Sequence, residues 1–128
     1  MERVQFISHQ GKKILLIDYT NCSAAEMKQI ATTGHEAAKS QPQGSVLQLV
    51  DLSGAQFSRE EIAHIKKIAA LNRPYIKRSA IVGAQTFPKA VWDGIKAFSV
   101  RDFKMFDTRP KALEWLTREE IGQWPMAS

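Results

Sequence analysis

The residues best suited to chemistry in this chain are acidic and hydroxyl side chains at the ends of predicted strands. In open parallel sheets ligands bind outside the carboxyl ends of the strands, so polar side chains there are natural candidates for a site. The candidates are Asp18, Tyr19, Asp51, Ser53, Ser58, Gly83, Gln85, Thr86, Asp107 and Thr108. Many of these residue types also form turns and cap helices. They predict either ordinary loops or a polar rim that binds a partner or a small ligand.

The sequence offers few residues that are suited to binding a metal ion or to nucleophilic catalysis. The three histidines, His9, His35 and His64, lack ligand spacing and Cys22 stands alone, so we expect no metal site. Cys22 precedes a predicted helix whose N-terminus would stabilise its thiolate, but no general base for it can be identified, so we expect an ordinary, partly buried cysteine. Glycine-rich phosphate loops and the Gly-x-Ser-x-Gly motif are absent from the sequence. These observations predict a protein that is not an enzyme and needs no cofactor.

Length and composition predict one globular domain over residues 1–128, with a core at about 4–117 and a tail at 118–128. The chain has 128 residues, of which 44% are hydrophobic and 24% charged, as in ordinary soluble proteins. Its apolar runs are too short for a transmembrane segment, and its start shows no secretory signal. One cysteine cannot form an internal disulfide. Together these features favour the reducing cytoplasm.

Positive charge gathers in residues 66–104. This segment holds nine Lys or Arg against two Asp, a net charge of +7, whereas the whole chain carries +5. Such an excess marks either a surface for nucleic acid or an acidic partner, or a solvated face. The basic residues are spread over two predicted helices and their loops. We therefore favour the solvated face and expect no specific nucleic-acid partner.

The elements that must position these residues alternate between strands and helices. Residues 3–9 and 12–18 are strand-like runs around Gln10-Gly11, which suits a hairpin, and the unbroken apolar run 14–17 indicates an interior strand. Ser23 with Glu26 and Ser58 with Glu61 form capping boxes, which start helices. Further strands are predicted at 46–50, 79–82 and 104–106, and helices at 24–40, 59–72, from about 87, and at 110–117.

The predicted order is therefore β-β-α-β-α-β-α-β-α. Strands joined through a single helix run parallel, whereas a hairpin makes its two strands antiparallel. We expect an α/β fold with a mostly parallel sheet and an antiparallel N-terminal edge strand.

Three stretches of this pattern resemble a known family. They are residues 47–54 at a strand exit, residues 76–83 with a basic lead-in to a short strand, and Phe106 followed by residues 112–116. The organisation from about residue 4 to 117 resembles the STAS domain of anti-anti-sigma factors. It is more similar to the SpoIIAA-like branch, which is structurally akin to CRAL-TRIO lipid-binding domains. The resemblance implies a STAS/SpoIIAA-like fold and a bacterial regulatory role.

The chain departs from this family at the start of the second helix. Sigma-regulating STAS proteins carry there a Ser or Thr that a partner kinase phosphorylates. In this chain the position falls near Glu60, and the nearby Ser58 is explained by its capping box. The resemblance therefore does not carry over the kinase switch. Glu60 offers a permanent negative charge instead, although acidic residues are expected in a first helical turn from the helix dipole alone.

The resemblance implies a partner-binding surface around the start of this helix. The candidate partner-binding residues are Ser53, Ser58, Glu60, Glu61 and, on the third helix, Trp92. Trp92 lies between Lys89 and Lys96, about 120° from the centre of the apolar stripe. It is either an anchor for a partner or a rim residue packed on a lysine stem.

Two functions follow from these observations. The first is a non-enzymatic regulatory or adaptor domain that binds a protein partner. The sequence leaves open whether the chain forms a homodimer. The alternative is binding of a lipid or other small apolar ligand in a CRAL-TRIO-like manner. Its pocket would be lined by residues that serve equally well as core: Met27, Phe57, Phe87, Phe98 and Phe103.

Overall fold

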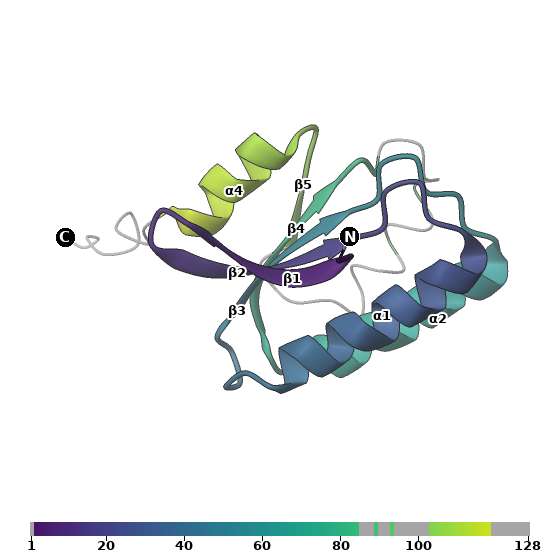
Figure 1. The fold of residues 1–128 in the computed structure, drawn as a ribbon, viewed down its shortest axis with the longest axis horizontal. Helices are drawn as coiled ribbons and strands as arrows, with labels where there is room; N and C mark the ends of the chain where they lie inside the picture. The colour runs from purple at the N-terminus through teal and green to yellow at the C-terminus, as the bar shows by residue number, and fades with distance from the viewer. Residues whose placement is uncertain (1, 85–88, 90–92, 94–102, 119–128) are drawn as a thin grey trace.

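The computed structural model describes residues 2–84, 89, 93 and 103–118. Within these ranges five strands form one sheet in the order β1-β2-β3-β4-β5. The strands are β1 (Val4–His9), β2 (Lys12–Asp18), β3 (Val46–Asp51), β4 (Ile76–Val82) and β5 (Phe103–Phe106). The described helices are α1 (Ala24–Lys39), α2 (Arg59–Asn72) and α4 (Arg109–Thr117). Helices α1 and α2 lie on one face of the sheet and α4 lies on the other (Figure 1).

The sheet has the predicted mixture of directions. β1 pairs antiparallel with β2 at one edge, and the pairs β2–β3, β3–β4 and β4–β5 are all parallel. The β1–β2 connection is a tight turn in which Gln10 and Gly11 have φ values of 54° and 74°. Positive φ at both central residues matches the twist of a hairpin, which explains the glycine at this point. The predicted α/β class, mostly parallel sheet and antiparallel edge strand are confirmed.

β2 is buried on both faces, as its unbroken apolar run predicts. Ile14 and Leu16 pack in the cluster beneath α4, whereas Leu15 and Ile17 pack in the cluster beneath α1 and α2. Alternate residues of a strand face opposite sides, so both faces of an interior strand need apolar side chains. Helix α1 lies close to the sheet at Gly34, where a Cβ atom would come within 2.9 Å of the Ile17 side chain.

The helices begin where the capping residues predict. At the start of α1 the Ser23 hydroxyl accepts from the backbone N–H of Glu26 at 3.2 Å, and the Glu26 carboxylate accepts from the N–H of Ser23 at 2.9 Å. Helix α4 begins after Thr108, which caps it, and has Pro110 in its first turn. Proline is tolerated there because the first helical N–H groups have no partner within the helix.

β4 is longer than predicted, because it begins at Ile76 and not at Ser79. The basic lead-in belongs to the strand, with Ile76 and Arg78 buried and Lys77 exposed between them. Arg78 donates from Nη1 to the carbonyls of Trp115 and Arg118, both at 3.2 Å, and so places a cation at the C-terminus of α4. This part of the basic segment is therefore buried and structural, and the solvated face that we favoured does not include Arg78.

The predicted third helix lies largely outside the described residues. Lys89 and Asp93 are helical and form an ion pair of 3.2 Å between Nζ and Oδ2. The candidate Trp92 is outside the described residues, as is the tail beyond Arg118.

The packing of α4 gives a direct test of the fold. Leu116 is 1% exposed and packs among Leu47, Leu49 and Val82 in one cluster. We expect Leu116→Ala to lower the free energy of unfolding by about 2–5 kcal/mol, because it leaves a cavity in a packed core. Leu71→Ala is the matched control: Leu71 is 47% exposed, so its loss should stay within about 0.5 kcal/mol. Denaturant unfolding measures both, and equal small losses would contradict this position of α4.

Candidate functional site

The carboxyl ends of β2 and β3 place two carboxylates side by side. Asp18 and Asp51 are partners in the parallel register, and both residues are buried. Arg109, at the start of α4, contacts the two carboxylates: its Nε lies 2.6 Å from Asp51 Oδ2 and its Nη2 lies 3.5 Å from Asp18 Oδ1. The predicted rim residues Asp18 and Asp51 are therefore brought together, but around a cation that the sequence analysis did not assign to them.

Asp18 is also held from its other side. The backbone N–H and the hydroxyl of Thr20 donate to Asp18 Oδ1 at 2.9 and 2.6 Å. Arg3 donates from Nη1 to the Thr20 carbonyl at 2.6 Å and lies 3.9 Å from Asp18 Oδ1. Asp51 accepts through Oδ1 from the N–H of Ser53 at 3.0 Å. Both carboxylates are thus occupied by protein donors.

The charges at this rim are balanced. Burial alone raises the pKa of Asp18, but hydrogen bonds from Thr20 and the charges of Arg109 and Arg3 outweigh it, so the pKa lies below its usual value. Burial alone lowers the pKa of Arg109, and the contacts with Asp51 and Asp18 reverse this, so its pKa is raised. The lowered pKa keeps Asp18 ionised, and both carboxylates are paired with Arg109, which suits a structural role better than a general base.

The contacts of Asp18 with Arg109 and Thr20 make the stability of the fold depend on pH. The pKa of folded Asp18 lies below the unfolded value of about 3.9, so its contribution is complete above that value and is lost as pH falls through the folded pKa. We expect the free energy of unfolding to fall between about pH 5 and pH 2. Asp18→Asn should be less stable at pH 7 and should lose less stability on acidification. Denaturant titrations at pH 7, 4 and 3 measure this, and parallel curves for the two proteins would contradict it.

Of the predicted partner-binding residues, Ser53 lies in a loop, whereas Ser58 and Glu61 lie at the start of α2. Ser53 lies in the loop after β3, packed against Gly83, where a Cβ atom would come within 2.6 Å of the Ser53 nitrogen. Ser58 and Glu61 start α2: the Glu61 Oε1 accepts from the N–H and the hydroxyl of Ser58 at 2.8 and 2.6 Å. These bonds, the hydroxyl first, lower the pKa of Glu61. Ser58 and Glu61 are therefore committed to the helix start.

Glu60 is placed differently from its neighbours. Its side chain is 75% exposed on α2, and its Oε1 lies 3.5 Å from Nζ of Lys28 on α1. An exposed pair of this kind contributes little to stability. Glu60 is therefore available to a partner at the surface where α1 and α2 meet.

Two further expectations concern Cys22 and metal binding. Cys22 is buried, and this burial raises the pKa of its thiol in spite of the nearby Arg3 and the helix start. The thiolate that the helix N-terminus was expected to favour is therefore disfavoured, because desolvation outweighs that effect. Among the described residues, no group of three or more His, Cys, Asp or Glu is arranged to hold a metal ion.

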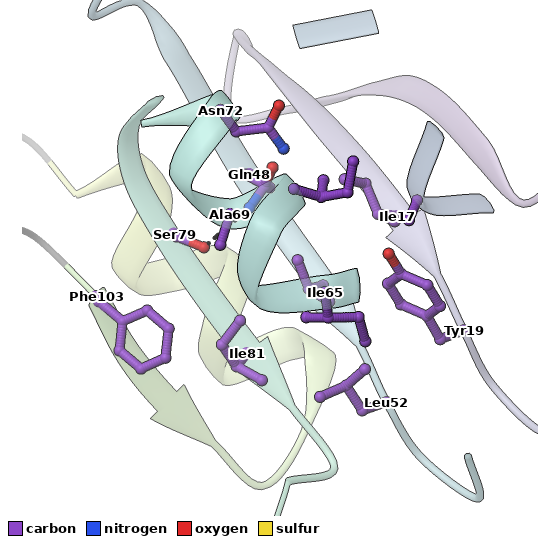
Figure 2. Close-up of a pocket in the computed structure, with 13 residues that line it drawn as sticks. Ile17, Tyr19, Gln48, Leu52, Ile65, Ala69, Asn72, Ser79, Ile81 and Phe103 are labelled. Atoms are coloured by element: carbon purple, nitrogen blue, oxygen red, sulfur yellow. Dashed lines mark hydrogen bonds between the residues drawn. The ribbon is translucent and has the colours of Figure 1, made fainter. Parts of the chain in front are cut away.

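A cavity of about 70 Å³ lies between α2 and the sheet (Figure 2). Side chains from four strands and two helices line it, and most of them are apolar, as represented by Ile17, Val50, Ile65 and Ile81. Phe103 of β5 closes one side. Apolar cavities of this kind are where proteins hold small molecules.

Two polar strand residues face the same cavity. Gln48 and Ser79 stand on neighbouring strands in register, and Gln48 Nε2 donates to Ser79 Oγ at 3.1 Å. Gln48 is 8% exposed, and its Oε1 has no hydrogen-bond partner among the described residues. Figure 2 shows the amide nitrogen directed toward Ser79 and the oxygen turned to the side on which Asn72 lies. Asn72 is also buried, and its Oδ1 is 2.6 Å from Nδ1 of His35 on α1.

The predicted pocket residues coincide with this cavity only in part. Of the predicted pocket residues, Phe103 lines it, whereas Met27 is buried in the core and Phe57 packs edge-on against Tyr19 with ring centres 5.8 Å apart. Phe87 and Phe98 lie outside the described residues. Gln48 was missed, and the available signal was a single polar residue within the apolar strand of residues 46–50.

Comparison with known proteins does not extend these observations. No family model, curated protein or solved structure matches the chain. No helix in the described part of the chain is long and apolar enough to cross a membrane. Evidence on function therefore comes from the rim around Asp18 and Asp51 and from the cavity beneath α2.

Proposed function

We propose that this domain is a non-enzymatic binding module that takes up a small, mostly apolar molecule in the cavity between α2 and the sheet. The observation that carries the proposal is an apolar cavity of about 70 Å³ with the unpartnered Gln48 Oε1 on its wall. Protein interiors are packed with few voids larger than a water molecule, and each empty void destabilises the fold. A ligand would fill this space and partner the oxygen.

The remaining chemistry of the described residues supports a binding role without catalysis. Asp18 and Asp51 are paired with Arg109, so neither carboxylate is placed to act as a general base. The Cys22 thiol is buried and its pKa is raised, which disfavours a nucleophilic thiolate. The resemblance to the SpoIIAA-like branch, which is akin to CRAL-TRIO lipid-binding domains, agrees with the same proposal, in a cytoplasmic setting.

Native mass spectrometry of protein purified at low salt tests this function. We expect the wild-type protein to carry a small additional mass, or to bind small aromatic molecules added to it. Ala69 lines the cavity, so Ala69→Phe should fill the space and abolish this binding. Ala63→Phe on the exposed side of the same helix is the control and should leave binding unchanged. Wild-type protein that shows only its bare mass and binds no probe would contradict the proposal.

A second candidate function is a regulatory or adaptor role through a protein partner. The exposed Glu60 favours it, because its carboxylate lies near Lys28 at the surface where α1 and α2 meet, next to the helix start that the Ser58–Glu61 bonds form. The proposed surface is centred on Glu60 with Ser53 and Ser58 nearby, as the STAS resemblance implies, whereas Glu61 is buried beneath it. It requires no phosphorylation of the chain.

Charge reversal at Glu60 separates this candidate from the first. Glu60→Lys should weaken a partner that recognises the start of α2, while the free energy of unfolding changes by no more than about 0.5 kcal/mol. Glu36→Lys on the exposed side of α1 is the matched control. Partners recovered from cell lysate by each variant can be compared quantitatively. Equal recovery with both variants would remove Glu60 from the interface.

A further inference from the structure

The interior pair formed by Gln48 and Ser79 raises a specific question about what fills the cavity. A carboxamide has an acceptor oxygen and a donor nitrogen, and here only the nitrogen is used, on Ser79 Oγ at 3.1 Å. The oxygen is buried without a partner. A buried polar atom in this condition destabilises the fold unless something outside the described residues bonds to it.

The other residues of the cavity limit what that partner can be. None of the described side chains that line the cavity is charged, so an ionised group would be buried there without a counter-ion. The Tyr19 hydroxyl also stays neutral, because burial raises its pKa. The cavity of about 70 Å³ has space for about five water-sized positions, which limits the occupant to a small molecule.

We infer that the ligand is a small uncharged molecule with an apolar body and one hydrogen-bond donor, such as a phenol, and that Gln48 Oε1 accepts from that donor. This inference rests on the proposed function and adds the chemical class of the ligand to it. The apolar body would lie among Ile65, Ile81 and Phe103, which make up the aliphatic and aromatic wall. The donor would lie at the Gln48 end, beside Asn72.

Ordered water is the competing occupant. Water could satisfy Gln48 Oε1 and could also bond to Ser79 or Asn72 at the polar end of the cavity. The apolar wall offers it no partner, and buried waters ordinarily make about three hydrogen bonds. A ring with a hydroxyl satisfies both parts of the cavity at once. The two occupants are distinguished by whether a donor-bearing ring displaces what is already there.

Three aromatic probes of similar size test the inference on the full chain: phenol, anisole and toluene. Phenol offers a donor, anisole only an acceptor, and toluene neither. Methyl resonances of Ile65 and Ile81 in titrations report binding within the cavity, with Ala69→Phe as the blocked control. We expect wild-type protein to bind phenol about tenfold more tightly than toluene or anisole, as one satisfied buried acceptor implies.

Substitution of Gln48 assigns that preference to one atom. Gln48→Met keeps the length of the side chain but removes the acceptor, so the preference for phenol should disappear while toluene still binds. Gln48→Leu is a second variant with the same expectation, and Gln5→Met on the exposed side of β1 is the control. Both Gln48 variants also remove the donor to the buried Ser79 Oγ, so their denaturation midpoints are measured beside binding to show that the domain stays folded.

The outcomes separate the inference from the function on which it rests. If none of the probes binds wild-type protein, the proposed function and the inference both fail. If all three bind equally, the cavity binds ligands but the role of Gln48 is wrong. A preference for anisole, or a preference for phenol that survives Gln48→Met, would also overturn the inference.

Discussion

The contact of the Arg109 guanidinium with Asp18 and Asp51 is the interaction on which the rest of the structure depends. Parallel pairing of β2 with β3 puts these two carboxylates next to each other at the ends of buried strands, where like charges repel. Arg109 is the first residue of α4, so the same contact that neutralises the carboxylates fixes one end of this helix. Arg78 of β4 donates to carbonyls at the other end. The helix is held at both ends and covers the second face of the sheet.

This use of charge makes the two faces of the sheet different. Strand ends of a parallel sheet are the usual ligand site, but here the aspartates are occupied by Arg109, Thr20 and Arg3. The opposite face differs, because α2 and the sheet leave an apolar cavity between them. The rim is therefore filled by contacts within the protein, whereas the space beneath α2 stays open and is lined mostly by apolar side chains.

The cavity and the rim depend on the alternation within the same strands. In β3, Asp51 faces α4 and the rim, whereas Gln48 and Val50 face the cavity. Ser79 stands beside Gln48 in the register of β3 with β4, so the two polar side chains meet within an otherwise apolar layer. Within a low-dielectric interior a satisfied pair of this kind is strong, and an unsatisfied oxygen beside it is costly. The unsatisfied Gln48 oxygen is therefore the polar feature that distinguishes this cavity from an ordinary apolar core.

The sequence by itself determined the elements and their direction. Apolar runs, two capping boxes and the Gln10-Gly11 turn fixed β1, β2, α1 and α2, because these signals act between residues near in sequence. It also placed Asp18 and Asp51 at the same rim. Only the tertiary structure brought Arg109 to those carboxylates, buried Arg78, and left Gln48 Oε1 without a partner among the described residues. These results depend on packing between segments far apart in the chain, where distance and desolvation decide charge and pairing, and no local pattern of residues encodes them.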